Sequence, residues 1–252
     1  MSEIFDSVAA FVRLAGYSVN TEGVIGSVEG IKNRKSLTEL FFNFRNLVRR
    51  NLPEIAKFTD KKLQNQIKAP DKWTKLLNDL LSDWSKKSQD IFKQWLITFP
   101  EGHDWRIAAR YLAGGWFEEY CLWKLSEDSS KKDVRTGMMP GWEGQKPDPR
   151  NAAQELDVAY TDGFGLTIVE CKTGQIKQDH FQKLENLTAT FGGAFGSGIL
   201  ASLNKPAPDI IERVKSSRNV TLIWGNGLAN LNESILEAKS KHMKIYPLRE
   251  IT

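Results

Sequence analysis

Two acidic side chains and one lysine lie where the sequence predicts two neighbouring strands. Residues 155–160 (ELDVAY) and 166–172 (LTIVECK) are short apolar segments joined by a glycine-containing turn, which predicts a β-hairpin. The first strand carries Asp157, and the second carries Glu170 and Lys172. Because side chains alternate between the faces of a strand, Glu170 and Lys172 point to the same side. Two carboxylates on adjacent strands beside a lysine suit a hard divalent cation and an attacking water.

An acidic and a basic residue two positions apart on a strand usually belong to an ordinary solvated face. The flanking residues decide between that interpretation and a metal site. The apolar stretch 166–169 indicates a buried strand, and Cys171 faces the side opposite the charges. Buried carboxylates are costly unless they are paired or bind metal. We therefore expect Asp157 and Glu170 to bind Mg²⁺ or Mn²⁺, with the main-chain carbonyl of Cys171 as a further ligand.

This arrangement resembles the PD-(D/E)xK nuclease superfamily. The resemblance implies that Asp157 and Glu170 are the two metal ligands and that Lys172 stabilises charge or orients the water during phosphodiester cleavage. A literal Pro147-Asp148 pair also occurs upstream, but the prolines and glycines around it indicate a loop. Asp157 therefore matches the superfamily motif better than Asp148 does.

A more specific resemblance covers residues 108–205, which are similar to the nuclease domains of CARF-fused CRISPR ancillary nucleases. It rests on four segments: 114–120 (GGWFEEY), 154–158 (QELDV), 168–174 (IVECKTG) and the pair Gly192-Gly193. The resemblance implies that Glu118, in preference to Glu119, and also Glu155 contribute acidic groups to the site. Gln154 stands where that family often has asparagine. The implied activity is metal-dependent endonucleolytic cleavage of DNA or RNA in prokaryotic defence.

The first hundred residues read as helices. Residues 3–14 are amphipathic, Ser36 to Glu39 form a capping box, and Pro70 begins a longer helix directed toward Pro100. A CARF domain would instead alternate strands with helices. We therefore expect an all-α N-terminal region and do not extend cyclic-oligoadenylate sensing to this chain.

The remaining segments predict an α/β fold with a restriction-endonuclease-like mixed sheet flanked by helices. Helices are expected at 105–125, 179–191, 206–218 and 228–241, and strands outside the hairpin at 134–138, 197–202, 220–224 and 243–247, with a loop at 140–149. The Gly114-Gly115 pair predicts a kink or a close helix–sheet contact. The expected domains are a helical region over 1–100 and a nuclease-like domain over 101–252.

Nucleic acid is the expected partner. The formal net charge is +4 with a pI of about 8.9, which is compatible with a polyanion without establishing one. Trp142 could stack on a base, Lys146 and Arg150 could meet phosphates from the same loop, and Lys183 could do so from the following helix. Packing and simple solvation are the alternatives at each of these positions. The lysine-rich region 31–75 could contact phosphates or dock a partner or a second copy.

Composition bounds the other possibilities. No apolar run is long enough to span a membrane, and the N-terminus lacks the features of a signal peptide. Two cysteines far apart indicate a reducing compartment, so we expect a cytoplasmic protein. The three histidines do not cluster, which argues against zinc. A catalytically silent nucleic-acid-binding or partner-docking protein on the same fold stays open, as do the substrate type, a homodimer and a regulatory partner.

Overall fold

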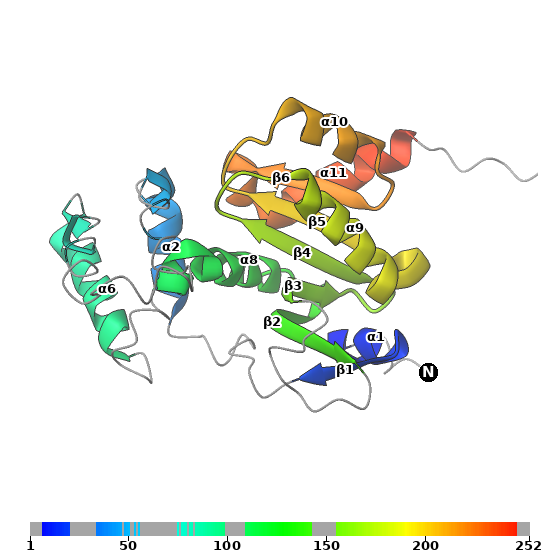
Figure 1. Cartoon of the computed structure of the whole chain (residues 1–252), viewed down its shortest axis with the longest axis horizontal. Coiled ribbons are helices and arrows are strands. Elements are labelled where there is room, and N and C mark those ends of the chain that lie inside the picture. Colours follow the sequence, from blue (N-terminus) through cyan, green and yellow to red (C-terminus); the bar gives the residue numbers. More distant parts are fainter. Residues whose placement is uncertain are drawn as a thin grey trace, which may run out of the picture. The chain divides into compact units, whose positions relative to one another are not determined.

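The computed structural model divides into two compact units (Figure 1), Met1–Ile31 with Cys121–Thr252, and Lys32–Tyr120. This grouping differs from the expected division at residue 100. The domain boundary at that residue stays a prediction. The structure describes residues 7–20, 34–46, 48–50, 53, 55, 75, 77–79, 81–82, 84–98, 109–142 and 155–245.

A six-stranded sheet, in the order β1-β2-β3-β4-β5-β6, forms the centre of the first unit. Its strands are β1 (Tyr17–Asn20), β2 (Lys132–Trp142), β3 (Leu156–Thr161), β4 (Leu166–Lys172), β5 (Ser197–Ser202) and β6 (Val220–Trp224). Strands β1 to β4 pair antiparallel, and β4, β5 and β6 pair parallel (Figure 1). The mixed sheet with flanking helices confirms the predicted fold class.

The β3–β4 hairpin is the element that the sequence predicted most directly, and it is confirmed. Val158 pairs with Val169, and the two strands are almost wholly buried, as their many apolar residues predict. In the turn, Asp162 Oδ1 accepts the main-chain N–H groups of Phe164 and Gly165, each at 3.0 Å. An aspartate that binds the backbone two and three residues ahead holds such a turn in place.

One face of this sheet is covered by α1 (Val8–Leu14), α9 (Gln178–Gly192) and α10 (Pro208–Ser216). Apolar side chains of these helices share a core cluster with Ile168 and Leu200 of the strands. Helix α9 approaches closely at Gly198, where an added Cβ would lie 2.9 Å from Leu184 and Thr188. The predicted helix at 179–191 is therefore confirmed, and its position over β4 and β5 brings its polar face to the end of the hairpin.

The N-terminal segment departs from the all-helical expectation, because β1 is a strand of the sheet. It pairs antiparallel with β2, from Tyr17 opposite Trp142 to Asn20 opposite Met139. This pairing also extends β2 through Pro140 to Trp142, where a loop was predicted. A four-residue strand is too short to show a periodic pattern, and its partner lies more than a hundred residues away in the sequence.

Two further corrections concern the helices. The capping box predicted at Ser36–Glu39 is wrong, because the N-cap of α2 (Lys35–Asn43) is Arg34, two residues before Ser36, and it makes no side-chain cap. The strand predicted at 243–247 is also wrong, because α11 (Leu231–Ile245) continues through Met243. Residues 246 and 247 lie outside the described part of the chain, as do residues 3–6 and 70–74 of the expected N-terminal helices.

The second unit packs its helices around aromatic rings. Its elements include α2, α6 (Lys86–Thr98), a π-helical turn (Tyr111–Gly115) and the first residues of α8 (Trp116–Ser126). The ring of Phe41 lies 5.6 to 6.2 Å from those of Trp84, Phe92, Tyr111 and Trp116. The irregularity expected at Gly114-Gly115 is present as the π-helical turn, a feature that often lies near functional residues.

A buried ion pair joins two helices of this unit. The Arg34 guanidinium donates to both carboxylate oxygens of Glu119, at 3.1 Å from Nε and 2.5 Å from Nη2, and Tyr111 donates to the same carboxylate at 2.9 Å. Burial raises the pKa of Glu119, although Arg34 opposes that rise. Glu119 is therefore held by structural partners within its own unit.

We expect Arg34→Ala to lower the free energy of unfolding by about 3–5 kcal/mol, because it leaves Glu119 buried without its counter-charge. Raising the folded-state pKa of an acid makes the fold less stable as pH rises, so the deficit should shrink at acidic pH, where Glu119 protonates. Thermal unfolding at pH 7.5 and pH 5 measures both effects. Lys93→Ala, at an exposed position of α6, is the control. An equal loss at both pH values would contradict the ionic explanation.

Candidate active site at the end of the hairpin

The hairpin brings two carboxylates into contact with one ammonium group. The register places Asp157 opposite Glu170, one position beyond the Val158–Val169 pair. Lys172 Nζ lies 2.6 Å from Glu170 Oε1 and 3.5 Å from Asp157 Oδ2. The carboxylates therefore converge on one face of the sheet, as the alternation of side chains along the strands predicted.

Main-chain and hydroxyl groups position Asp157. Its Oδ2 accepts the N–H of Cys171 at 2.8 Å, so the neighbouring strand fixes the carboxylate directly. Its carbonyl oxygen accepts the hydroxyl of Thr136, on β2, at 2.6 Å. Asp157 is thus anchored to the strands on both sides of it, and its side chain has little freedom to turn away from Glu170.

Helix α9 supplies a second cation. Lys183 Nζ lies 3.3 Å from Glu170 Oε1 and 3.2 Å from Oε2. Glu170 is only 1% exposed, whereas the side chains of Lys172 and Lys183 are 22% and 33% exposed. The acidic groups therefore lie at the bottom of the site, and the ammonium groups lie between them and solvent. The structure places Lys183 at the site, and its predicted contact with phosphate stays a prediction.

The electrostatics of the three groups are coupled. Burial raises the pKa of Asp157 to about 6, and the negative charge of Glu170 raises it in the same direction. Burial alone would lower the pKa of Lys172, but the charges of Asp157 and Glu170 outweigh it and raise that pKa well above its ordinary value. The raised pKa favours the charged ammonium form of Lys172 at neutral pH, which can donate hydrogen bonds.

One residue near the site was not among those predicted. His180 lies on α9 three positions before Lys183, a spacing that places both side chains on the same face of a helix. Its Nδ1 accepts the main-chain N–H of Lys177 at 3.2 Å. Burial lowers the pKa of His180, and the positive charge of Lys172 adds to this effect. The three-residue spacing between His180 and Lys183 was the sequence signal that could have predicted a position for His180 near the site.

The other predicted residues have different outcomes. Glu118 belongs to the Lys32–Tyr120 unit, and Glu155 is exposed just before β3. Trp142 ends β2, and Lys146 and Arg150 lie outside the described residues. The roles proposed for all five remain predictions.

The donor atoms fit a hard divalent cation. Within the described residues, no three carboxylate, imidazole or thiol side chains gather as a metal-binding group. Mg²⁺ needs fewer, because it is commonly held by one or two carboxylates and keeps several waters. Asp157 and Glu170 provide two such carboxylates on one face of the sheet, and one ammonium group lies within 3.5 Å of both. The residues present therefore suit Mg²⁺ or Mn²⁺.

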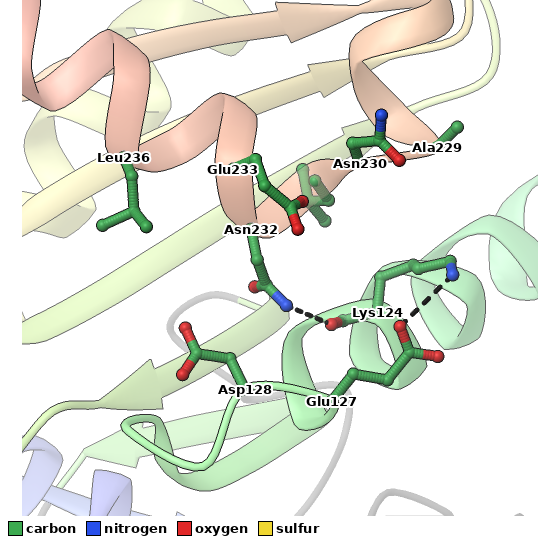
Figure 2. A pocket seen from close by; sticks show the side chains of 9 residues that line it. Lys124, Glu127, Asp128, Ala229, Asn230, Asn232, Glu233 and Leu236 are labelled. Atoms are coloured by element: carbon green, nitrogen blue, oxygen red, sulfur yellow. Dashed lines mark hydrogen bonds and ion pairs between the residues drawn. The ribbon is translucent and has the colours of Figure 1, made fainter.

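A separate pocket of about 340 Å³ lies between the end of α8 and the beginning of α11 (Figure 2). Asn232 donates to the carbonyl oxygen of Lys124 at 2.7 Å, and Lys124 pairs with Glu127 at 3.2 Å (Figure 2). None of the residues of the carboxylate–lysine group lines this pocket. It is therefore distinct from the candidate active site.

Comparison with known proteins shows the family of this chain. Residues 105–243, more than half of the 252-residue chain, match the family described as Card1-like, endonuclease domain. The chain belongs to this family. The matched region contains the hairpin, α9 and the parallel strands. The predicted resemblance to the nuclease domains of CRISPR ancillary nucleases is confirmed at the level of the family.

Solved structures share the fold of this Card1-like chain. Protein VC1899 from Vibrio cholerae has a TM-score of 0.66 and 20% identity, over 94% of this chain and 63% of that one. Can2 from Sulfobacillus thermosulfidooxidans, solved in complex with cyclic tetra-adenylate, has a TM-score of 0.58 and 16% identity, over 92% and 61%. The chain thus spans somewhat less than two thirds of the length of each structure. At identities this low, the similarity shows a shared fold and nothing about function. No curated protein matches it.

Proposed function

We propose that this Card1-like chain is a metal-dependent endonuclease that hydrolyses phosphodiester bonds of DNA or RNA in the cytoplasm of a prokaryote, as part of a defence system. The observation that carries the proposal is the contact of the Lys172 ammonium with two buried carboxylates, Asp157 and Glu170. Such a group can bind a cation on one side and a phosphate on the other. Within the described residues, no helix has the length and apolar character needed to cross a membrane.

Asp157 and Glu170 would hold Mg²⁺ or Mn²⁺ through their carboxylates, with the carbonyl of Cys171 as a further donor and Glu118 or Glu155 in support. A metal bound there lowers the pKa of a water molecule and neutralises charge on the phosphate. The carboxylates are pre-positioned for this task, because the Cys171 N–H fixes Asp157 and burial restricts Glu170.

The two lysines would act on the phosphate. Lys172 is held as a cation between the carboxylates and solvent, so it would donate hydrogen bonds to a phosphate oxygen as negative charge develops there. Lys183 partly neutralises Glu170 and is the more exposed of the two, so it would bind the backbone of the substrate. Trp142, Lys146 and Arg150 are proposed as outer contacts to nucleic acid.

The direct test is incubation of the full chain with plasmid DNA, single-stranded DNA and RNA in Mn²⁺, in Mg²⁺ and in EDTA. We expect cleavage of at least one substrate with metal and none with EDTA. Binding without cleavage under every metal condition would support the catalytically silent alternative. Cleavage that persists in EDTA would show that the reaction does not use the proposed cation.

A further inference from the structure

The register of the parallel strands places an exposed tryptophan in the same row as Lys172, the proposed catalytic lysine. Lys172 of β4 pairs with Ser202 of β5, and Ser202 pairs with Trp224 of β6. These three residues therefore lie side by side at the carboxyl ends of the parallel strands. In open α/β sheets, ligands commonly bind outside this edge.

Trp224 and Lys172 also share a face of the sheet. Val220 belongs to the core cluster beneath the helices and Leu222 packs against it, so Trp224, the next residue in this alternation, faces the same side. Trp224 is 36% exposed, one of the large apolar residues that the described chain leaves in solvent. Gly225, with φ of +60°, ends the strand and begins a short 3-10 turn.

The distance between the lysine and the tryptophan suits a polynucleotide. Neighbouring strands lie about 4.8 Å apart, so two strand spacings separate Lys172 from Trp224 by about 10 Å. Ser202, the residue of the row that lies between them, is small and fully buried, so its side chain does not project between the lysine and the indole. An aromatic ring beside a phosphate-handling site is a natural stacking surface for a base.

We propose that Trp224 stacks on a nucleobase next to the phosphate that Lys172 and Lys183 bind, so that the substrate strand crosses the carboxyl ends of β4, β5 and β6. This inference rests on the proposed nuclease function. A base can lie on the indole only when it is unstacked from its neighbours and unpaired.

A second exposed aromatic residue of the same sheet provides a matched control for non-specific attraction of nucleic acid to aromatic rings. Phe164 is 84% exposed in the turn between β3 and β4, at the end of β4 opposite Lys172. A general attraction of nucleic acid to exposed aromatic rings would involve Phe164 at least as much as Trp224. A stacking site built into the substrate path would involve Trp224 alone.

Binding of a fluorescent single-stranded oligonucleotide tests the proposal, in Mn²⁺ and in a Lys172→Ala background in which cleavage is expected to be slow. Adding Trp224→Ala should weaken binding roughly 5- to 150-fold, the range expected for one base–aromatic stack. Trp224→Phe should retain most of the affinity, and Phe164→Ala should retain all of it. Thermal unfolding of each variant shows whether the fold is intact.

An abasic scan separates stacking from an indirect effect of the substitution. Removing the base at one position of the oligonucleotide should weaken binding to the Lys172→Ala protein by a factor similar to that of Trp224→Ala. The same abasic position should cause no further loss of affinity when Trp224→Ala is also present. Additive losses, or unchanged binding by Trp224→Ala, would overturn the stacking proposal while cleavage by the wild-type chain stands. Absence of both binding and cleavage in the wild type would instead overturn the nuclease function itself.

Discussion

Lys172→Ala should lower the rate of phosphodiester cleavage by at least about 10²- to 10³-fold, the loss typical when one donor to the transition state is removed. The physical reason is that the Lys172 ammonium is the one group that contacts both buried carboxylates among the described residues, and their charges keep it protonated. Oligonucleotide binding should persist, because Lys183 and the rest of the surface are unchanged. Single-turnover cleavage and equilibrium binding, measured on the same preparation, separate the two effects.

Two variants sharpen this expectation. Lys172→Arg keeps a positive charge but changes the geometry of donation, so it should restore only part of the rate. Lys215→Ala removes an exposed lysine of α10 that pairs with Glu212, and its rate should match the wild type. Full activity in the Lys172→Ala protein would show that the charge stabilisation comes from another group.

Asp157→Asn and Glu170→Gln should each abolish stabilisation by Mn²⁺, together with metal-dependent cleavage. For the wild-type chain, Mn²⁺ at one hundred times its dissociation constant should add about 2.7 kcal/mol to the free energy of unfolding. Each substitution replaces a charged oxygen donor by a neutral group of nearly the same shape. Thermal unfolding across a Mn²⁺ titration measures the loss, with Glu212→Gln at an exposed position of α10 as the control.

The metal-free stability of Asp157→Asn provides a second, independent result. Burial and the neighbouring charge of Glu170 disfavour the ionised form of Asp157, which the rise of its pKa to about 6 reports. An amide oxygen can still accept the N–H of Cys171 without that charge. We therefore expect the metal-free variant to be as stable as the wild type at neutral pH or more stable. A large loss of metal-free stability would mean that the carboxylate serves the fold and would undermine its assignment as a ligand.

The hairpin and the strands after it could be predicted because their signals are local. Residues 197–202 and 220–224 are apolar segments bounded by turn residues, and they form β5 and β6 with the predicted bounds. Strand β1 carried no comparable signal, because its four residues acquire their structure from β2. The strand expected at 243–247 failed for a related reason, since a short apolar segment can equally continue a helix, as it does in α11.

The sequence by itself determined the chemistry of the candidate site: two carboxylates and a lysine whose spacing, on strands joined by a short turn, places them on one face. This was possible because the alternation of side chains and the pairing of a hairpin are local rules. Only the tertiary structure decided what surrounds them. It placed Lys183 on Glu170, His180 one turn away, and Trp224 in the row of Lys172. Those positions follow from parallel pairing and from the packing of α9, which bring together residues that no local pattern connects.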